Sequence, residues 1–438
     1  MSNYAATVVQ IESIRKHENA NRLQIASIFN NDVVVGLDTK IGDIGLFFVL
    51  ESQLGLDFAV ANDLIRRKDE NGKVTGGMFD AKRRVRAQKL RGERSMGFFC
   101  PLSYLEKAGV DISGVKVGDT FEEIQGIQIS TKYIVPSNKK EQSTSKNGKK
   151  VKKEKSRIIP ELWNFHFDTS ALARNLHNIS PETLISVSWK LHGTSGITSN
   201  LPVLRRLPWY EKVLKAIGVK VQETEYALVC ASRKVIKSIG SEQNKNSGYY
   251  KVDVWTHAGQ YFADKLNKGE TIYYELVGYT PDGSWIQKLH DYGCNPGEYK
   301  IYVYRITQTN ADGVVTELPW SQVKHRSESM GVEVTPEIFY GRAKHFIPSF
   351  EGTQTEIDNF GQTLYDYLTE FYVYDQDSKF CKNKVPEEGV VVRVENGDGI
   401  VNYKYKSFTH LAFETKSLDA GETDIESSQE NEGETHEN

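Results

Sequence analysis

A stretch almost without apolar side chains divides this chain of 438 residues into two parts. Residues 137–156 read Ser-Asn-Lys-Lys-Glu-Gln-Ser-Thr-Ser-Lys and then Asn-Gly-Lys-Lys-Val-Lys-Lys-Glu-Lys-Ser. Such a composition cannot bury enough surface to offset its ordering entropy, so it predicts a flexible basic linker. The linker either tethers phosphates electrostatically or serves only as a soluble spacer. The parts on either side are therefore expected to fold as separate domains.

Composition limits the class of protein. The length suffices for two or three domains, and a hydrophobic content of 39% supports packed cores. Because the formal net charge is −3, any binding to nucleic acid must come from local basic surfaces. The four cysteines are scattered without a CxxC pair, which argues against a zinc site or a disulfide framework and fits a reducing compartment.

The sequence offers no targeting or membrane segment. Its first ten residues lack the basic start and apolar run of a signal peptide, and no stretch approaches the roughly 18 apolar residues of a membrane span. We therefore expect a soluble intracellular protein of the cytoplasm or nucleus, without a membrane partner. The sequence does not determine the oligomeric state, and a monomer is expected.

The segment 1–136 is predicted to be a small antiparallel barrel, because short β-like runs alternate with Gly, Asn and Asp. These runs cover residues 5–11, 23–29, 32–35, 44–49, 96–99 and 120–124. Between them lies a cationic run, interpreted as a phosphate contact with an ordinary solvated loop as its alternative. Its side chains are Lys82, Arg83, Arg84, Arg86, Lys89 and Arg91.

The segment 157–413 mixes strands with a few helices, and 414–438 is predicted to be a disordered acidic tail without assigned chemistry. One helix is expected over 209–217, where Trp209, Val213, Leu214 and Ile217 share a face that we interpret as core packing.

A strand in this segment ends at a lysine that has the setting of a nucleophile. Residues 184–189 alternate apolar and polar side chains, as in a half-buried strand, and Lys190 follows directly. Gly193 then permits a turn that leaves the backbone open to a ligand. A lysine amine attacks phosphorus only when it is unprotonated, which requires burial or cationic neighbours. The alternative is a solvated surface lysine.

Lys190-Leu191-His192-Gly193-Thr194 resembles motif I of the covalent nucleotidyltransferases, which are DNA ligases, RNA ligases and mRNA capping enzymes. Their usual pattern is Lys-x-Asp-Gly, whereas His at the third position followed by Gly-Thr is the variant of the RNA ligase 2 branch. The resemblance implies that Lys190 forms a lysyl-AMP intermediate, with His192 and Gly193 at the nucleotide.

Later segments resemble the family's other motifs in order. Ala231-Ser232-Arg233-Lys234 implies that Arg233 contacts the ribose or an RNA phosphate, because its guanidinium forks onto oxygens. Glu275 in the apolar run 272–278 would contact the ribose hydroxyls or metal-bound water. A surface arginine and a salt bridge within the core are the respective alternatives.

Within 300–306, Tyr304 aligns best with the family's aromatic that stacks on adenine, with Tyr302 in reserve on the same face; core packing is the alternative for both. Pro386-Glu387-Glu388-Gly389 resembles motif IV, which implies that Glu388 helps to hold Mg²⁺ or Mn²⁺ through water, with Glu387 as a solvated neighbour.

Asn402-Tyr403-Lys404-Tyr405-Lys406-Ser407 resembles motif V. The period of a strand puts Lys404 and Lys406 on one face, where the resemblance implies that both meet the α-phosphate. They would also surround the nucleophile with positive charge.

The arrangement resembles the Deinococcus-type RNA ligases, in which an OB domain precedes the nucleotidyltransferase domain. Residues 17–26, His-Glu-Asn-Ala-Asn-Arg-Leu-Gln-Ile-Ala, resemble the entry of OB modules that bind tRNA, and 208–214 and 278–283 also resemble that branch. The implied fold is α+β: an OB-fold barrel over 1–136, then a nucleotidyltransferase domain of antiparallel sheets flanked by helices over 157–413.

The implied activity is ATP-dependent sealing of 3′-hydroxyl and 5′-phosphate ends of RNA or of an RNA-containing duplex. A capping guanylyltransferase, an ATP-dependent DNA ligase and a non-catalytic RNA-binding protein remain as alternatives. His192 and the leading OB domain argue against capping, and the retained lysines and glutamates argue against a mere binder.

Overall fold

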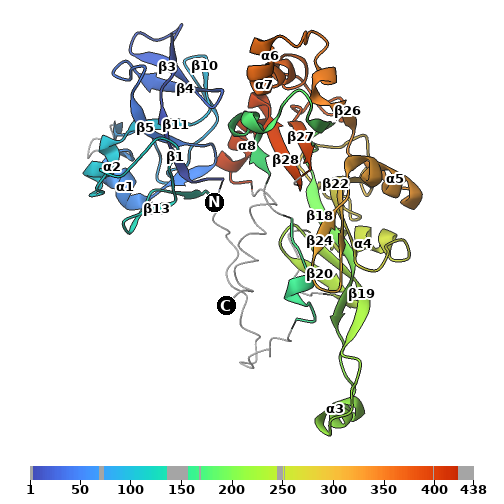
Figure 1. Ribbon diagram of the computed structural model, residues 1–438. Helices are drawn as coiled ribbons and strands as arrows, with labels where there is room; N and C mark the ends of the chain where they lie inside the picture. Colours follow the sequence, from blue (N-terminus) through green and yellow to red (C-terminus); the bar gives the residue numbers. More distant parts are fainter. Residues whose placement is uncertain are drawn as a thin grey trace. The chain divides into compact units, whose positions relative to one another are not determined.

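The computed structural model describes residues 3–68, 74–135, 156–166, 169–243, 250, 252–397 and 399–422. The chain forms two compact units, shown in Figure 1. The N-terminal unit comprises Met1–Val135, Ala173–Asn175 and Ser407–Glu422, and the C-terminal unit comprises Pro136–Leu172, Leu176–Lys406 and Thr423–Asn438. Apart from Ser156, the predicted linker lies outside the described residues.

The N-terminal unit is built from short antiparallel strands, and all six predicted β-like runs overlap one of them. Its strands are β1 (Ala6–Gln10), β2 (Ser13–Lys16), β3 (Leu23–Ile28), β4 (Asn31–Gly36), β5 (Ile44–Phe48), β6 (Ser52–Leu54), β7 (Arg66–Lys68), β8 (Val74–Gly76), β9 (Gln88–Leu90), β10 (Glu93–Ser95), β11 (Phe98–Pro101), β12 (Thr120–Phe121), β13 (Glu123–Ile124), β14 (Ile127–Gln128) and β15 (Ser130–Lys132).

These strands form one four-stranded sheet in the order β11-β5-β1-β12, one three-stranded sheet, β2-β3-β4, and four two-stranded ribbons. Alternate residues of β1 and β5 are buried with Phe58 of α1 (Leu56–Ala61) and Leu105 of α2 (Ser103–Lys107). The antiparallel pairing of these short strands agrees with the prediction from the sequence. Across the described part of the unit the sheets do not close into one barrel, because most of the remaining strands have only two or three residues and pair with one neighbour.

A C-terminal helix, α8 (Phe408–Asp419), belongs to the N-terminal unit. Ser407 caps it by accepting a hydrogen bond from the His410 N–H at 3.2 Å, and Phe408 and His410 are buried. The predicted tail therefore does not begin at residue 414, because buried anchors keep the chain helical to Asp419. Residues 423–438 of that tail lie outside the described residues.

The C-terminal unit holds two sheets. One contains β21-β20-β19-β18-β22-β23-β24, with β25 beside β23, and the other has the order β16-β28-β27-β17-β26. The bounds are β16 (Ser170–Ala171), β17 (Leu184–Trp189), β18 (Thr194–Leu204), β19 (Thr224–Ser232), β20 (Ile236–Ile239), β21 (Glu242–Gln243), β22 (Glu270–Gly278), β23 (Tyr299–Thr309), β24 (Val315–Glu317), β25 (Glu333–Val334), β26 (Glu337–Arg342), β27 (Gly389–Asn396) and β28 (Gly399–Lys406).

Pairing is antiparallel except for β16 with β28 and β25 with β23, so the sheets are mixed. Helices α4 (Val254–Gly259) and α5 (Trp320–Met330) bury Trp255 and Trp320 in a core with Ile272, Tyr274 and Val303 of the larger sheet. Helices α6 (Gln354–Asp358) and α7 (Phe360–Phe371) also belong to this unit. No helix within the described ranges is long and apolar enough to cross a bilayer.

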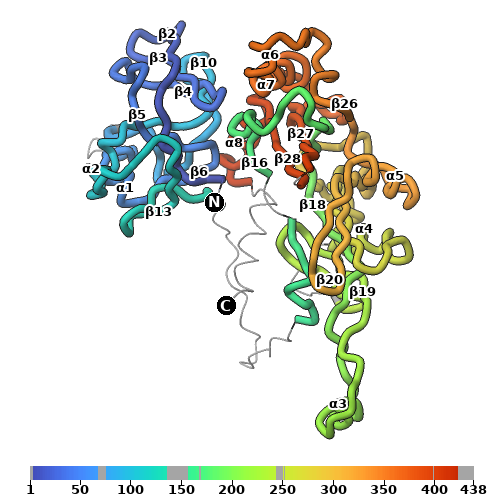
Figure 2. The backbone as a smooth tube through the Cα atoms, viewed as in Figure 1, coloured from blue at the N-terminus to red at the C-terminus, as the bar shows by residue number. Residues whose placement is uncertain are grey.

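The helix expected over 209–217 forms as α3 (Trp209–Ala216), but the interpretation of its apolar face as core is wrong. Trp209 is 77% exposed and Ile217 is 71% exposed, and none of the helix's residues is buried. The reason is its position at the tip of the long β18–β19 hairpin, which Figure 2 shows clearly. Periodicity reveals a shared face and not what covers it.

Candidate active site

Lys190 stands at the end of β17, which lies between β27 and β26 in the smaller sheet. Its backbone N–H donates to the Gly389 carbonyl at 2.9 Å, which fixes the point where the strand ends. Its Nζ lies 2.7 Å from Oε1 of Glu388, the residue directly before β27. The pairing of β17 with β27 therefore brings together two residues nearly 200 positions apart in the sequence.

Glu388 is the centre of a charged cluster. Its carboxylate is 2% exposed, and Nζ of Lys406 lies 3.1 Å from the same Oε1 that Lys190 contacts. Antiparallel pairing of β27 with β28 puts Gly389 opposite Lys406 and so fixes this contact. Nδ1 of His192 is 4.0 Å from Oε2. A buried carboxylate is costly unless it is paired, and here two ammonium groups share it.

Lys404 lies two residues before Lys406 in β28, opposite Val391, so both lysines are on the same face of the sheet. Its other neighbour is β16, where Ala171 is its partner in register. The structure therefore brings Lys190 and Lys406 into direct contact with Glu388 and places His192 4.0 Å from it. Lys404 lies at the adjoining position of the same strand face.

Glu275 holds the turn that follows Lys190. It lies on β22, opposite Ser195 of β18, and accepts hydrogen bonds from the Gly193 N–H at 3.0 Å and the Ser195 hydroxyl at 3.2 Å. A Cβ at Gly193 would lie 2.1 Å from the Leu276 carbonyl oxygen. Glycine is therefore needed for close approach of the backbone, as well as for the turn that the sequence predicted.

The two candidate tyrosines differ in their surroundings. Tyr304 is half-buried, donates to Ser195 Oγ at 3.4 Å, and meets the edge of the His166 ring with centroids 5.4 Å apart. Burial raises the pKa of Tyr304 above its ordinary value, and the charge of Glu275 adds to that rise. Tyr302 is 8% exposed and packs in an apolar cluster that includes Tyr292.

Arg233 directly follows β19. Its charge acts on Tyr304 and lowers the pKa of that phenol, against the larger effect of burial. Arg233 and Tyr304 are thus electrostatic neighbours, although Arg233 follows β19 and Tyr304 lies on β23.

A loop that the sequence did not single out supports the turn around His192. Tyr292 Oη accepts a hydrogen bond from the His192 N–H at 2.6 Å, and Gln287 Nε2 donates to the Gly193 carbonyl at 2.8 Å. The ring of His290 packs edge-on against that of His192, with centroids 4.7 Å apart. Burial raises the pKa of Tyr292 well above its ordinary value. The loop's positive φ angles, 69° at Leu289 and 46° at Tyr292, have no sequence signature.

The interpretation of Glu387 as a solvated neighbour is wrong. It is 3% exposed, and its N–H donates to the Gln376 carbonyl at 3.0 Å, which fixes the backbone just before β27. Burial raises the pKa of Glu387 to about 7, even though a hydrogen bond with Ser378 acts in the opposite direction. Consecutive glutamates therefore point into two different buried environments.

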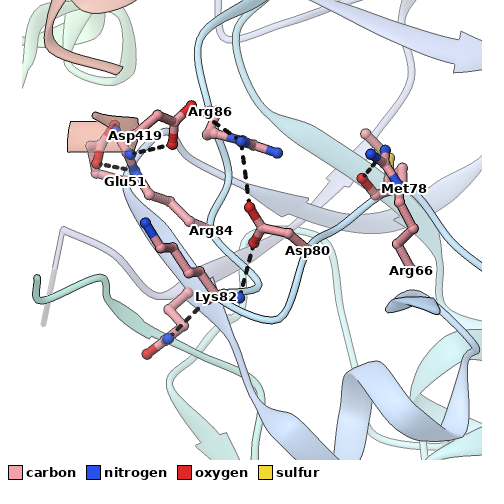
Figure 3. A network of polar contacts seen from close by, with 9 residues as sticks. Glu51, Arg66, Met78, Asp80, Lys82, Arg84, Arg86 and Asp419 are labelled. Carbon is pink, nitrogen blue, oxygen red and sulfur yellow. Dashed lines mark hydrogen bonds and ion pairs between the residues drawn. The ribbon is translucent and has the colours of Figure 1, made fainter. Parts of the chain in front are cut away.

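The predicted cationic run of the N-terminal unit is divided between buried and exposed positions. Figure 3 shows the contacts of three of its members, Lys82, Arg84 and Arg86. Arg84 is 1% exposed and forms two 2.7 Å contacts with the Glu51 carboxylate, with Asp419 3.4 Å away. Arg84 is therefore not presented to a nucleic acid, because carboxylates hold its guanidinium away from solvent. Arg86 is partly exposed beside Asp419 at 3.2 Å.

The remaining members of the run are more accessible. Arg83 is half-buried and donates to the Leu54 carbonyl at 2.9 Å, whereas Lys82, Lys89 and Arg91 are exposed.

The fold of the chain is that of an α+β protein with mixed and antiparallel sheets, of the RNA ligase kind. It is similar to a mutant RNA ligase of Naegleria gruberi solved with AMP and Mn, at a TM-score of 0.57 and 16% identity over 93% of this chain and 97% of that chain. The same ligase with PPi gives a TM-score of 0.58 and 16% identity, over 94% and 98%. No protein-family model and no curated protein matches the chain.

Proposed function

We propose that this protein is an ATP-dependent RNA ligase that joins 3′-hydroxyl and 5′-phosphate ends. The observation that carries the proposal is the contact of Lys190 Nζ with Glu388 Oε1 at 2.7 Å, with Lys406 on the same oxygen. The likeness in fold to an RNA ligase solved with AMP or ATP and Mn supports it. The leading unit of antiparallel strands supports the branch in which an OB-like domain comes first.

In the first step the Lys190 amine attacks the α-phosphorus of ATP. A phosphorus–nitrogen bond forms, the bond to pyrophosphate breaks, and the nearest acceptor for the ammonium proton is Glu388 Oε1. AMP then passes to a 5′-phosphate, and attack by a 3′-hydroxyl on that phosphate releases AMP and seals the strand. Lys406 and Lys404 supply positive charge where phosphate oxygens gather, so positioning and electrostatics provide most of the catalysis.

The residues fit a divalent cation. Glu388 and Glu275 offer carboxylate oxygens, the ligands that Mg²⁺ and Mn²⁺ favour, and both lie beside the turn after Lys190. Since two lysines already contact Glu388 Oε1, contact through water suits this site better than direct ligation. When bound, such an ion would neutralise charge on the triphosphate and the leaving group.

The nucleotide contacts follow from the same geometry. Tyr304, half-buried and hydrogen-bonded to Ser195, is the better candidate for stacking on adenine, because Tyr302 is enclosed in the core. Arg233, whose charge reaches Tyr304, would fork onto ribose or phosphate oxygens. Glu275 would meet the ribose, with the backbone of His192 and Gly193 forming the adjoining wall.

The RNA contact is proposed for the exposed cations of the N-terminal unit, Lys82, Lys89 and Arg91, together with the partly exposed Arg83 and Arg86. They would bind the phosphate backbone, while the A-form shape and the 2′-hydroxyls distinguish RNA from DNA.

A sealing assay tests the proposal. Nicked duplexes with either a ribose or a deoxyribose at the 3′-hydroxyl are incubated with Mg²⁺ and ATP or GTP. We expect sealing with ATP and a 3′ ribose, and equal sealing of the two nicks would reject RNA specificity. Transfer from GTP to a 5′-diphosphate RNA end would favour a capping enzyme instead.

A further inference from the structure

Two loops of the C-terminal unit enclose the backbone around Lys190. We call residues 287–293 the first loop, which lies between β22 and β23, and residues 376–388 the second loop, which lies between α7 and β27. The loops are 91 residues apart in the sequence where they meet, so only tertiary contacts hold them together.

The first loop holds the turn that follows Lys190. Tyr292 Oη accepts a hydrogen bond from the His192 N–H at 2.6 Å. Gln287 Nε2 donates to the Gly193 carbonyl at 2.8 Å. Because both contacts are with the backbone of the turn, the position of the turn depends on the position of the loop.

The second loop packs on both neighbours of Lys190. The rings of Phe380 and Trp189 meet edge to face with centroids 6.2 Å apart, and Lys379 Nζ lies 3.7 Å from the centroid of the Trp189 ring. Phe380 also packs against the apolar cluster that contains Leu191. The second loop therefore contacts the residue before the proposed nucleophile and the cluster that holds the residue after it.

One buried carboxylate joins the two loops. Asp291, in the first loop, is 3% exposed. Its Oδ1 accepts hydrogen bonds from the N–H groups of Gly293 at 2.7 Å and Lys382 at 3.0 Å, and its Oδ2 accepts one from the N–H of Asn383 at 2.8 Å. Asn383 Nδ2 in turn donates to the Leu289 carbonyl at 2.9 Å. Three hydrogen bonds thus connect the loops, and two of them end on Asp291.

Asp291 makes these contacts as an anion. Burial acts to raise the pKa of Asp291, but hydrogen bonds from the N–H groups of Lys382, Asn383 and Gly293 outweigh it and hold the pKa below its ordinary value. Hydrogen bonds to an ionised acceptor are the stronger kind. An asparagine at this position would have one oxygen in place of two, so it could not accept at both ends of the group.

We infer that Asp291 is a positioning residue for the adenylylation of Lys190, because it joins the two loops that fix the backbone on either side of that lysine. The inference rests on the proposed function and deepens it. Asp291 acts through Tyr292 on the turn after Lys190 and through Phe380 on the strand end before it. A reacting group displaced by about 1 Å can react about 100-fold more slowly, so a loosened link lowers the rate of bond formation more than the affinity for ATP.

The test compares the natural chain with Asp291→Asn in two reactions. The first is adenylylation of Lys190 over a range of concentrations of labelled ATP. The second is the sealing of a strand that already carries a 5′-adenylyl group, a step in which Lys190 forms no bond. We expect the variant to be adenylylated about 30-fold more slowly at saturating ATP, with half-saturation within about twofold of the natural value. Its sealing of the adenylylated strand should fall by less than about threefold.

Two further variants complete the test. Asp312→Asn is the matched control, because that carboxylate is exposed between β23 and β24, and it should behave like the natural chain in both reactions. Asn383→Ala removes the side-chain link to Leu289 from an exposed position and should slow adenylylation by about threefold. It tests the same link should Asp291→Asn fail to fold.

A natural rate of adenylylation in folded Asp291→Asn, or in Asn383→Ala where Asp291→Asn does not fold, would overturn the inference. An equal loss of both reactions in Asp291→Asn would also overturn it, because that loss reports less folded protein and not a displaced Lys190. Absence of label from the natural chain would instead refute the proposed function, whatever the variants do.

Discussion

Glu388 Oε1 lies 2.7 Å from Lys190 Nζ in a carboxylate that is only 2% exposed, and Lys406 Nζ reaches the same oxygen at 3.1 Å. One buried carboxylate thus holds the proposed nucleophile and one of its cationic partners together. Lys190 directly follows β17, Glu388 directly precedes β27 and Lys406 is the last residue of β28, so the pairing of these three strands forms the cluster.

Glu388→Gln should reduce lysine adenylylation by about 100-fold or more, because it removes both the charge that orients Lys190 and the nearest proton acceptor. Stability should fall by about 1–2 kcal/mol, less than for a fully buried ion pair, since both lysines are partly exposed. Single-turnover labelling and urea unfolding measure the two effects. An unchanged labelling rate would contradict the assigned role.

Lys406→Ala and Lys404→Ala should each lower adenylylation by about 100-fold, because both remove positive charge from the strand face that we propose meets the triphosphate. Lys416→Ala is the matched control, since that lysine is exposed on α8. Wild-type rates in Lys406→Ala would show that the contact with Glu388 has no catalytic consequence.

Gly193→Ala should abolish labelling and destabilise the protein by about 1–3 kcal/mol, because the new methyl group would collide with the Leu276 carbonyl oxygen. Gly114→Ala is the control, as no atom lies within 4 Å of its Cβ position. Thermal unfolding and labelling of both variants test this. If Gly193→Ala were as stable as Gly114→Ala, the close approach of the backbone at Gly193 would not be needed for stability.

Glu387→Gln should make stability less dependent on pH. Burial raises the pKa of Glu387 from 4.5 to about 7, so the folded state holds a proton that the unfolded state has lost. The natural protein therefore loses stability as the pH rises from about 4.5 to 7. The variant should be more stable than the natural protein by about 3 kcal/mol at pH 8 and equally stable below pH 4, as measured by urea unfolding in EDTA. A difference in stability between the two proteins that stays constant from pH 4 to pH 8 would contradict the raised pKa of Glu387.

Arg84→Met should destabilise the N-terminal unit by about 2–4 kcal/mol, because it leaves Glu51 without its buried partner. Arg91→Met, at an exposed position of the same run, should change stability by less than about 0.5 kcal/mol but weaken RNA binding. If Arg91→Met lowered stability and Arg84→Met weakened only RNA binding, the structural role of Arg84 and the RNA-binding role of Arg91 would both be wrong.

The site was more predictable from sequence than its surroundings. Alternation before Lys190 predicted a strand that exists, and the period of β28 put Lys404 and Lys406 on one face. These are local properties, which periodicity captures. The contact of Lys190 with Glu388 depends on the pairing of β17 with β27, which no local pattern contains.

The errors have the same origin. The sequence predicts that Glu387 is a surface residue, that Arg84 is a free cation and that the Trp209 face belongs to the core. Tertiary contacts determine whether each of these side chains is buried or exposed. Likewise, no local sequence pattern near Ser407 predicts that α8 belongs to the N-terminal unit. The helix is held there by residues distant in the sequence, such as Arg84 and Arg94.

The most direct measurement of the central claim uses ATP radiolabelled at the α-phosphate, with Mg²⁺ and no RNA. The natural protein should acquire one acid-labile label per chain, mapped to the peptide that contains Lys190, while Lys190→Ala acquires none and Lys416→Ala labels normally. Label that persists in Lys190→Ala, or its absence from the natural protein, would contradict the account.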